Sequence, residues 1–406
     1  MSVSQTLPLG RSGYYLKLFT LYSIVFLGSA GFFVTIPAYV ELFMGHSQAL
    51  IHTQMPLEQR RELFGIVMSL APFISMFFAP LMARFSDRFG RKPLMAICLV
   101  IAAIGFALPV FAIAAGSIIL LFIGNMLNSL GSASQPMAQA VLAEGSDGKH
   151  KATLMSLVAV VMTAAMSIGP AIGSKLTEIY GATAPFYACL LLALVNLSLL
   201  WSISSAPVAS SQSESIWSLT RPLARSKSAL LPSLGLVFIC QFCWSLYFQS
   251  IAFILPEKWH LAVSGSFYQG LMTAIGIIMI LSLLLLPQYL MTRWSLISCL
   301  RAALWVCGVG MLLLAVSPTP WLHALAMLPT AISAAILFPL YITRLSDSAS
   351  QQDQGWAMAL ASAAIGLAWT LSGYLTAILA NIYLLLPLLL AALGLFAANL
   401  LTRESR

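Results

Sequence analysis

Long apolar segments, separated by short polar or Pro/Gly breaks, follow one another along almost the whole chain. A helix that crosses a bilayer needs about 20 predominantly apolar residues. Only 8% of the 406 residues are charged, whereas a soluble domain carries about 25%. The sequence therefore predicts an all-α polytopic membrane protein. Twelve membrane-spanning helices can be delimited, at about 17–43, 63–83, 93–115, 117–143, 152–178, 183–204, 230–255, 266–290, 295–316, 321–344, 356–380 and 382–402.

The longest connection between these segments lies near the middle of the chain and is rich in serine and in basic residues. It divides the spans six from six. At an offset of 203 residues, the acidic end of the fourth span, Leu142-Ala143-Glu144, corresponds to Leu345-Ser346-Asp347 in the tenth. Two similar halves are suited to alternating access, with a site between them near the midplane of the bilayer. We therefore expect three parts: an N-terminal six-helix bundle (1–204), a cytoplasmic linker (205–229) and a C-terminal six-helix bundle (230–406).

The basic residues are distributed unevenly between the two sides of the predicted membrane. Of the 20 Lys and Arg residues, sixteen fall on the side of the termini, and the other four are Arg60, Arg61, Lys175 and Lys258. Cytoplasmic loops carry an excess of Lys and Arg, so both termini are predicted to be cytoplasmic, in a bacterial cytoplasmic membrane. The net charge of +8 does not come from a basic tract, which argues against binding of nucleic acid.

The side chains that could bind a metal or carry out catalysis are not clustered. All six cysteines lie in apolar segments, where they behave as small hydrophobic residues. Cys240 and Cys243 form a C-x-x-C, but no second pair of ligands lies nearby. No nucleophile–base set and no His/Asp/Glu cluster lies near the end of a span. We therefore expect no metal, no cofactor and no enzymatic activity.

The short loop after the second predicted span combines several cations with one acid. It reads Arg84-Phe85-Ser86-Asp87-Arg88-Phe89-Gly90-Arg91-Lys92-Pro93. Membrane topology explains the cations, and Gly90 and Pro93 can end one helix and begin the next, but neither argument requires Asp87. The run resembles the loop signature G-x-L-x-D-R-x-G-R-[KR] of the major facilitator superfamily, with Ala83 in place of the leading glycine. The resemblance implies the fold of that superfamily, twelve transmembrane helices in two pseudo-symmetric six-helix bundles.

We predict that this loop takes part in gating. Asp87 can pair with Arg88 or Arg91, and it can face the positively polarised N-terminus of the eleventh predicted helix. Such a contact would hold the two halves together on the cytoplasmic side. The candidate gating residues are Arg84, Asp87, Arg88, Gly90, Arg91 and Lys92.

The fourth and fifth predicted spans resemble the drug:proton antiporter branch of the superfamily, which includes the tetracycline exporters. Ser167–Ser174 is similar to the G-P-x-x-G-G stretch of that branch, and Gly124–Gly131 parallels its G-R-x-x-x-G stretch. Gly169, Pro170 and Gly173 lack large side chains, and the proline interrupts backbone hydrogen bonding. The fifth helix can therefore bend there and approach a neighbour. An ordinary helix-packing site is the alternative interpretation.

The resemblance implies proton-driven export, but the acidic residues are not placed where proton carriers are usually found. Relatives carry an arginine in the fourth span where this chain has Asn125, and several carry an aspartate in the first span where it reads Gly28-Ser29-Ala30-Gly31. All twelve acids lie at helix ends or in loops, whereas proton relays use ionisable groups inside the membrane. Glu41, four residues after Pro37, is the coupling candidate if the helix turns it inward, and a solvated helix end is the alternative. Proton exchange, coupling to another ion and facilitated diffusion stay open.

Neutral polar side chains within the spans are the candidates for lining a substrate cavity. Gln135 and Gln139 are four residues apart, and Gln241 and Gln249 are about two turns apart, so each pair can lie on one face of its helix. Bonding to the backbone of a neighbouring helix is the alternative. The whole set comprises Asn125, Asn128, Gln135, Gln139, Gln241 and Gln249.

A cavity lined by amides and aromatic rings, without fixed charge, suits a neutral or amphipathic organic molecule. We therefore expect a monomeric secondary active transporter in the lipid bilayer. It would export a small organic molecule, such as a drug, siderophore or metabolite, by alternating access, with or without exchange for protons. The alternative is a facilitator or importer of a nutrient or metabolite, from the same superfamily and without proton coupling.

Overall fold

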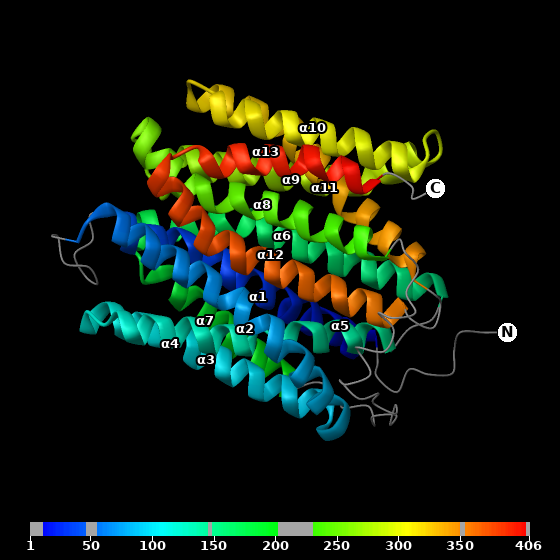
Figure 1. Cartoon of the computed structure of the whole chain (residues 1–406). Helices are drawn as coiled ribbons and strands as arrows, with labels where there is room; N and C mark the ends of the chain where they lie inside the picture. The colour runs from blue at the N-terminus through cyan, green and yellow to red at the C-terminus, as the bar shows by residue number, and fades with distance from the viewer. Residues whose placement is uncertain (1–10, 46–54, 145–147, 202–229, 350–353, 403–406) are drawn as a thin grey trace.

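The chain folds into a bundle of long, closely packed helices (Figure 1). The computed structural model describes residues 11–45, 55–144, 148–201, 230–349 and 354–402. The predicted linker at 205–229 lies outside the described residues. The helices are α1 Arg11–Met44, α2 Leu57–Phe89, α3 Arg91–Ala115, α4 Ile118–Gly131, α5 Ser134–Glu144, α6 Gly148–Tyr180, α7 Ala184–Trp201, α8 Leu230–Trp259, α9 Ser266–Met291, α10 Leu296–Val316, α11 Pro320–Ser348, α12 Gln354–Ile382 and α13 Leu386–Ala398, with the 3₁₀ turn η3 at Asn399–Thr402.

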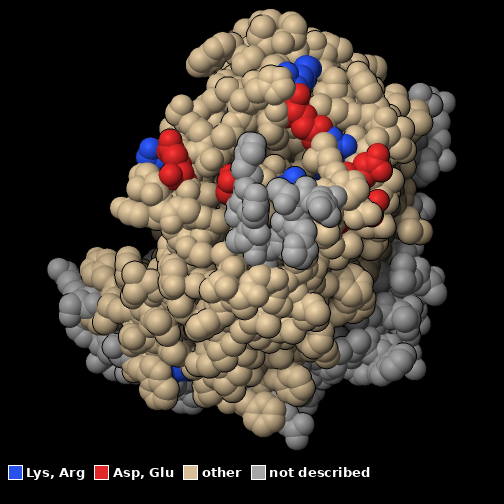
Figure 2. Space-filling model, turned by 90° about the vertical axis from the view of Figure 1, so that its left-hand side faces the viewer, with Lys and Arg blue, Asp and Glu red and all other residues tan. Residues whose placement is uncertain are grey.

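Helices α1–α7 form an N-terminal half and helices α8–α13 a C-terminal half. The beginning of α1 and the end of α13 lie at the same end of the bundle, which we call the termini end (Figure 1). The opposite end, which we call the distal end, carries the last turn of α1 and of α8 and the first turn of α2. Figure 2 views the molecule from the distal end, and most of the acidic and basic side chains that it shows gather in the upper part of this face.

Within the described residues, ten helices are long and apolar enough to cross a membrane, and 386–402 forms a shorter apolar helix. Large apolar side chains such as Leu191, Leu284 and Leu393 are more than half exposed on the outside of the bundle. Because lipid tails are as apolar as leucine, such a surface belongs in a bilayer. The predicted all-α polytopic architecture is confirmed.

Two of the predicted spans need correction. The fourth span was expected to be continuous over 117–143, but it is divided into α4 and α5 at Ser132 and Ala133. The proline at Pro136 has no N–H to donate to the carbonyl four residues earlier, and its ring would clash with that group. The carbonyl of Ser132, four residues before the proline, instead accepts from the N–H of Gln135 at 3.0 Å. The last span begins at Leu386 instead of 382, because α12 continues to Ile382.

Small residues bring the helices together within each half. A β-carbon at Gly105 of α3 would lie 2.8 Å from the Cα of Asn128 on α4. A β-carbon at Gly173 of α6 would overlap the carbonyl oxygen of Val34 on α1. Helices in membranes associate through this kind of close packing, since no hydrophobic force drives them together in lipid.

The two halves meet along two pairs of helices, α2 with α12 and α6 with α9. A β-carbon at Gly65 of α2 would lie 2.9 Å from the Cβ of Ala377 on α12. A β-carbon at Gly276 of α9 would lie 2.5 Å from the Cβ of Ser167 on α6. The two interfaces between the halves, α2 with α12 and α6 with α9, are therefore packed as tightly as the helices within either half.

Candidate functional site

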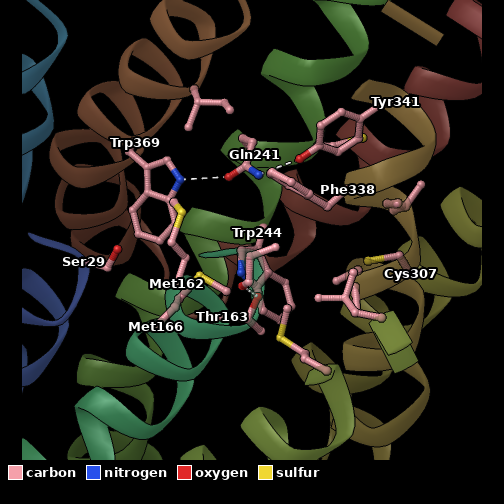
Figure 3. Close-up of a pocket in the computed structure, with 18 of the residues that line it drawn as sticks. Ser29, Met162, Thr163, Met166, Gln241, Trp244, Cys307, Phe338, Tyr341 and Trp369 are labelled. Carbon is pink, nitrogen blue, oxygen red and sulfur yellow. Dashed lines mark hydrogen bonds between the residues drawn. The ribbon is translucent and has the colours of Figure 1, made fainter. Parts of the chain in front are cut away.

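A cavity of about 370 Å³ lies between the two halves (Figure 3). α1 and α6 supply the wall from the N-terminal half, and α8–α13 supply the wall from the other half. None of the described side chains that line it is charged. Its aromatic, methionine and polar lining comprises Phe33, Trp244, Phe338, Tyr341, Trp369, Met162, Met166, Met279, Ser29, Thr163 and Gln241.

Gln241 of α8 joins three helices on the cavity wall (Figure 3). Its Nε2 donates to the hydroxyl of Tyr341 on α11 at 2.6 Å. Its Oε1 accepts from the Nε1 of Trp369 on α12 at 2.9 Å. An amide has two donors and two lone pairs, so Gln241 keeps one N–H and one lone pair for a bound molecule. The cavity can therefore recognise donors and acceptors without a fixed charge.

Aromatic rings close the cavity on its distal side. α1 and α8 both run from the termini end to the distal end. Phe33, which is itself part of the lining, and Phe248 therefore lie about one turn closer to the distal end than Ser29 and Trp244. The ring of Phe33 packs edge-on against Phe248 with centroids 6.0 Å apart, and against Trp369 at 5.7 Å. Edge-to-face pairs of this kind are favourable beyond their buried area. They join α1 of one half to α8 and α12 of the other.

Beyond these rings, Arg61 of α2 reaches into the C-terminal half. Its guanidinium pairs with both carboxylate oxygens of Glu257 on α8. It also donates to the carbonyl of Ala380 at 3.1 Å and to Oδ1 of Asn381 at 3.0 Å, both on α12. In return, Nδ2 of Asn381 donates to the carbonyl of Glu58 at 3.4 Å. We call Arg61, Glu257 and Asn381 the distal clamp.

Further polar contacts link the halves near the distal clamp. The Oγ of Ser174 on α6 donates to the carbonyl of Val263 at 2.8 Å. The Nε2 of Gln269 on α9 donates to Oε2 of Glu178 at 3.0 Å. These polar contacts, like those of the distal clamp, join the halves at the distal end. The protein is therefore closed at this end, with the cavity on the side of the termini end.

The distal clamp was not predicted from the sequence, in which Arg61 is one of four basic residues on the sparsely charged side. The sequence did contain one indication of an ion pair. Charges are rare in this chain, and Arg61 and Glu257, which have opposite charge, are predicted on the same side of the membrane in different halves. Their pairing could not be read from the sequence, since 196 residues separate them.

Two of the predicted cavity residues instead bond within the helix packing. Asn125 is 2% exposed, and its Nδ2 donates to the carbonyl of Val67 on α2 at 2.9 Å. The Nε2 of Gln249 donates to the hydroxyls of Ser245 and Ser372, at 3.0 and 3.2 Å. Gln249 therefore connects α8 to α12 inside the C-terminal half, whereas Gln241 on the same helix lines the cavity.

The other predicted amides lie on α4 and α5. The Nε2 of Gln135 donates to the hydroxyl of Ser29 at 2.9 Å, so it positions a cavity residue. Nε2 of Gln139 contacts the sulfur of Met162, another cavity residue, at 3.4 Å. Asn128 lies where α4 packs on Gly105 of α3. None of these three amides belongs to the lining of the cavity itself.

The segment expected to be a gating loop is mostly helical, because α2 continues to Phe89 and only Gly90 lies between α2 and α3. The side chains of Arg84, Asp87 and Arg88 lie outside the described residues, so their gating role stays a prediction. Gly90 has a φ of +98°, a conformation that glycine adopts readily, and its N–H donates to the carbonyl of Ser86 at 3.0 Å. Arg91 and Lys92 begin α3, and Nζ of Lys92 contacts the carbonyl of Trp201 at 3.4 Å.

The glycine and proline residues of the fifth predicted span lie on α6. Gly173 and Gly169 face α1, and a β-carbon at Gly169 would lie 3.1 Å from the Cβ of Phe33. Pro170 lies inside α6, which continues through it. The coupling candidate Glu41 lines a separate distal cavity of about 270 Å³, together with His260. It is therefore remote from the central cavity.

Comparison with known proteins identifies the family. The model of the major facilitator superfamily matches residues 18–371. The chain belongs to the major facilitator superfamily. It is a transporter and not an enzyme. Within the described residues, no group of three or more His, Cys, Asp or Glu side chains is placed to hold a metal ion.

Curated members of the superfamily match this transporter over different lengths. The class G tetracycline resistance protein of Vibrio anguillarum is 28% identical over 151 residues, which are 37% of each chain. This chain therefore spans about a third of the length of the tetracycline resistance proteins that it matches. Sugar efflux transporter B of Salmonella typhimurium is 25% identical over 80% of this chain and 81% of its own.

The fold is also that of solved transporters. The crystal structure of the human organic anion transporter MFSD10 superposes with a TM-score of 0.69 and 17% identity, over 96% of this chain and 99% of that one. At this identity the likeness concerns the fold alone.

Proposed function

We propose that this transporter exports an uncharged or amphipathic organic molecule across a bacterial cytoplasmic membrane by alternating access. The observation that carries the proposal is the central cavity, which is closed distally and lined by aromatic rings, methionines and one amide network. Flat rings of a bound molecule can stack on Trp and Tyr side chains. A carbonyl or hydroxyl of that molecule can form a hydrogen bond with the remaining N–H or lone pair of Gln241.

The absence of charge among the described lining residues argues for a neutral cargo. A charged molecule that leaves water needs an opposite charge or several hydrogen bonds in its site, because burial of an unpaired charge is very costly. Methionine side chains, which are flexible and polarisable, adapt to ligands of different outline. The cavity is thus suited to a drug-like or metabolite-like molecule more than to a multiply charged one.

The direction of transport follows from the topology that we propose. If the basic-rich termini end is cytoplasmic, the distal end is extracellular and the cavity is loaded from the cytoplasm. The names of the matched relatives, tetracycline resistance proteins and a sugar efflux transporter, support export. We further propose that the protein acts as a monomer, since one chain forms the whole cavity.

A facilitator is the second candidate. It is favoured by the lack of any described carboxylate on the cavity wall and by the remote position of Glu41. A proton carrier has to reach both sides of the membrane in turn, and such groups usually face the interior of the bundle.

Flux into proteoliposomes tests both candidates. Radiolabelled tetracycline and glucose would be presented with and without an imposed pH gradient, and an uncoupler would be added at steady state. We expect accumulation of at least one of the two against its gradient, and collapse of that accumulation by the uncoupler. Equilibration without accumulation would favour the facilitator. If a panel of organic molecules shows flux of multiply charged compounds alone, the proposal of a neutral cargo is wrong.

Replacing Gln241 with leucine should weaken cargo binding without unfolding the protein. The change removes the shared partner of Tyr341 and Trp369, which costs about 1–2 kcal/mol of binding free energy and raises KM roughly 5- to 30-fold. The measurement is the concentration dependence of flux for the cargo found above. Gln139→Leu is the matched control, because Gln139 does not line the cavity, and an equal rise in KM in both variants would contradict the role of Gln241.

Replacing Asp87 with asparagine should impair transport while leaving the amount of inserted protein unchanged. The proposed contact between Asp87 and the N-terminus of the eleventh predicted helix, α12, holds the halves together at the termini end, and it weakens when the charge is lost. We expect a fall in flux of roughly tenfold, equivalent to about 1.4 kcal/mol. Glu58→Gln, at the opposite end of the same helix, is the control. Unchanged flux in Asp87→Asn would exclude the gating role.

A further inference from the structure

We propose that the distal clamp is the outer gate of this transporter, and that it makes the distally closed state the resting conformation. The proposal rests on the alternating-access function proposed above. It assigns a role to Arg61, Glu257 and Asn381, which the loop signature of the superfamily does not include.

The guanidinium of Arg61 is held almost entirely by the other half of the protein. Its side chain is 8% exposed, and its four described hydrogen bonds end on α8 and α12. The planar guanidinium matches the two oxygens of Glu257, which lysine could not do. It also lies 5.7 Å from the ring centre of Phe253 on α8, close enough for a cation–π contact.

These bonds distinguish two conformations of the protein. Because Arg61 bonds to the C-terminal half and not to its own, its contacts do not stabilise the fold of the N-terminal half. Separation of the halves at the distal end breaks all four bonds together and returns both ions to water. A contact shifts the equilibrium between two conformations only if it is present in one and absent from the other. The bonds of Arg61 meet this condition, so they favour the conformation that is closed at the distal end.

The α12 end of the clamp adds an electrostatic reason for its placement. Ala380 and Asn381 belong to the last turn of α12, where unpaired carbonyl groups form the negative end of the helix dipole. Arg61 donates to one of these carbonyls directly. The guanidinium of Arg61, which belongs to the N-terminal half, thus donates to a carbonyl at the C-terminal end of α12 that would otherwise need a water molecule as its hydrogen-bond donor.

An aromatic layer lies directly beneath the clamp. Phe64, one turn after Arg61 on α2, packs edge-on against Phe253 with centroids 5.4 Å apart. Both rings are buried, and Phe253 lies one turn before Glu257 on α8. Water that enters an opened clamp reaches these rings before the cavity. The distal barrier therefore has a charged outer layer and an apolar inner layer, and we expect the charged layer to control its opening.

The distal end offers a matched control for the clamp. Arg60, next to Arg61 on α2, donates to the carbonyls of Phe43 and Gly45 at 2.7 and 2.8 Å, and both of these residues belong to the N-terminal half. These bonds therefore do not change when the halves separate. Loss of the Arg60 side chain should leave the distal equilibrium unchanged.

The test measures the distance between the halves directly and uses no cargo. Spin labels would be attached at Tyr180→Cys on α6 and Trp321→Cys on α11, two distal positions that are 71% and 75% exposed. The six native cysteines are buried and would be replaced by alanine. Distance distributions by double electron–electron resonance in lipid nanodiscs then give the ratio of closed to open distal ends.

We expect Arg61→Ala and Glu257→Gln each to lower the ratio of closed to open distal ends at least tenfold. Arg61→Lys should give an intermediate shift, because it keeps the charge but loses the paired geometry. Exchange of the charges, in Arg61→Glu with Glu257→Arg, should recover part of the closed population. Arg60→Ala should change the ratio less than twofold.

An unchanged ratio in Arg61→Ala and Glu257→Gln would overturn the proposal, as would an equal shift in Arg60→Ala. If Arg61→Ala leaves an unpaired acid that prevents folding, Asn381→Ala and Arg61→Lys carry the test, since each removes only part of the clamp. Because the distances are measured without cargo, the gate can fail while export stands. The export function can likewise fail in the flux assay while the gate stands.

Discussion

Replacing Gly173 with alanine is expected to lower the stability of the N-terminal half by about 2–3 kcal/mol, because overpacking forces the backbone apart. The new β-carbon would overlap the carbonyl oxygen of Val34, which belongs to the backbone of α1 and cannot rotate away. The measurement is the thermal midpoint of the purified protein in detergent, together with the yield of folded protein.

Gly270→Ala provides the control for this prediction. Gly270 also lies within a long helix, α9, but apart from its chain neighbours and the backbone of its own helix no heavy atom lies within 4 Å of its β-carbon position. Alanine is the better helix former, so this variant should be neutral or slightly more stable. Equal thermal midpoints of Gly173→Ala and Gly270→Ala would show that α1 and α6 do not depend on this close approach.

Trp369→Ala is expected to have the second large effect, on both stability and transport. Trp369 is 9% exposed, bonds to Gln241 and packs edge-on against Phe32 and Phe33 of the opposite half. Deletion of a buried tryptophan costs about 3–5 kcal/mol. It also removes a wall of the cavity and part of its distal closure, so cargo flux should fall to background.

Trp369→Phe separates the two roles of this side chain. Phenylalanine keeps an aromatic ring between the halves but has no N–H for Gln241. We expect the thermal midpoint to return most of the way to the wild-type value, while KM stays raised by about as much as in Gln241→Leu. Full recovery of KM in Trp369→Phe would mean that the hydrogen bond to Gln241 has no part in cargo recognition.

The polar residues of α8 explain why part of the site could be predicted and part could not. Gln241 and Gln249 were both assigned to one helix face from their spacing, but Gln241 lines the cavity and Gln249 bonds to Ser245 and Ser372. Periodicity indicates which side chains share a face of a helix. It does not say which neighbouring helix covers each turn of that face.

Asn125 and Pro136 illustrate the same limit on α4 and α5. A polar residue in the middle of a span suggested a cavity, yet Asn125 bonds to the backbone of α2. The break between α4 and α5 has a local cause in Pro136. It was not predicted, because the whole segment is apolar and long enough to span a membrane. Hydropathy averages over many residues and is insensitive to a single interruption.

Short stretches of consecutive residues were enough to predict the class of protein and its superfamily. Apolar segments of membrane-spanning length leave a chain no soluble alternative, and the order of charges around Asp87 is specific enough to indicate the family, which the family model then confirmed. Both are local properties, readable over ten to twenty consecutive residues.

The residues that line the cavity and those that close its distal end were revealed by the packing of the helices. Arg61, Glu257 and Asn381 come from three helices in two halves of the chain, and Gln241 meets partners 100 and 128 residues away. In a bilayer, these meetings depend on close packing at small residues such as Gly65 and Gly173. Close packing depends on the shapes of two helix surfaces in contact, so it cannot be predicted from either segment alone.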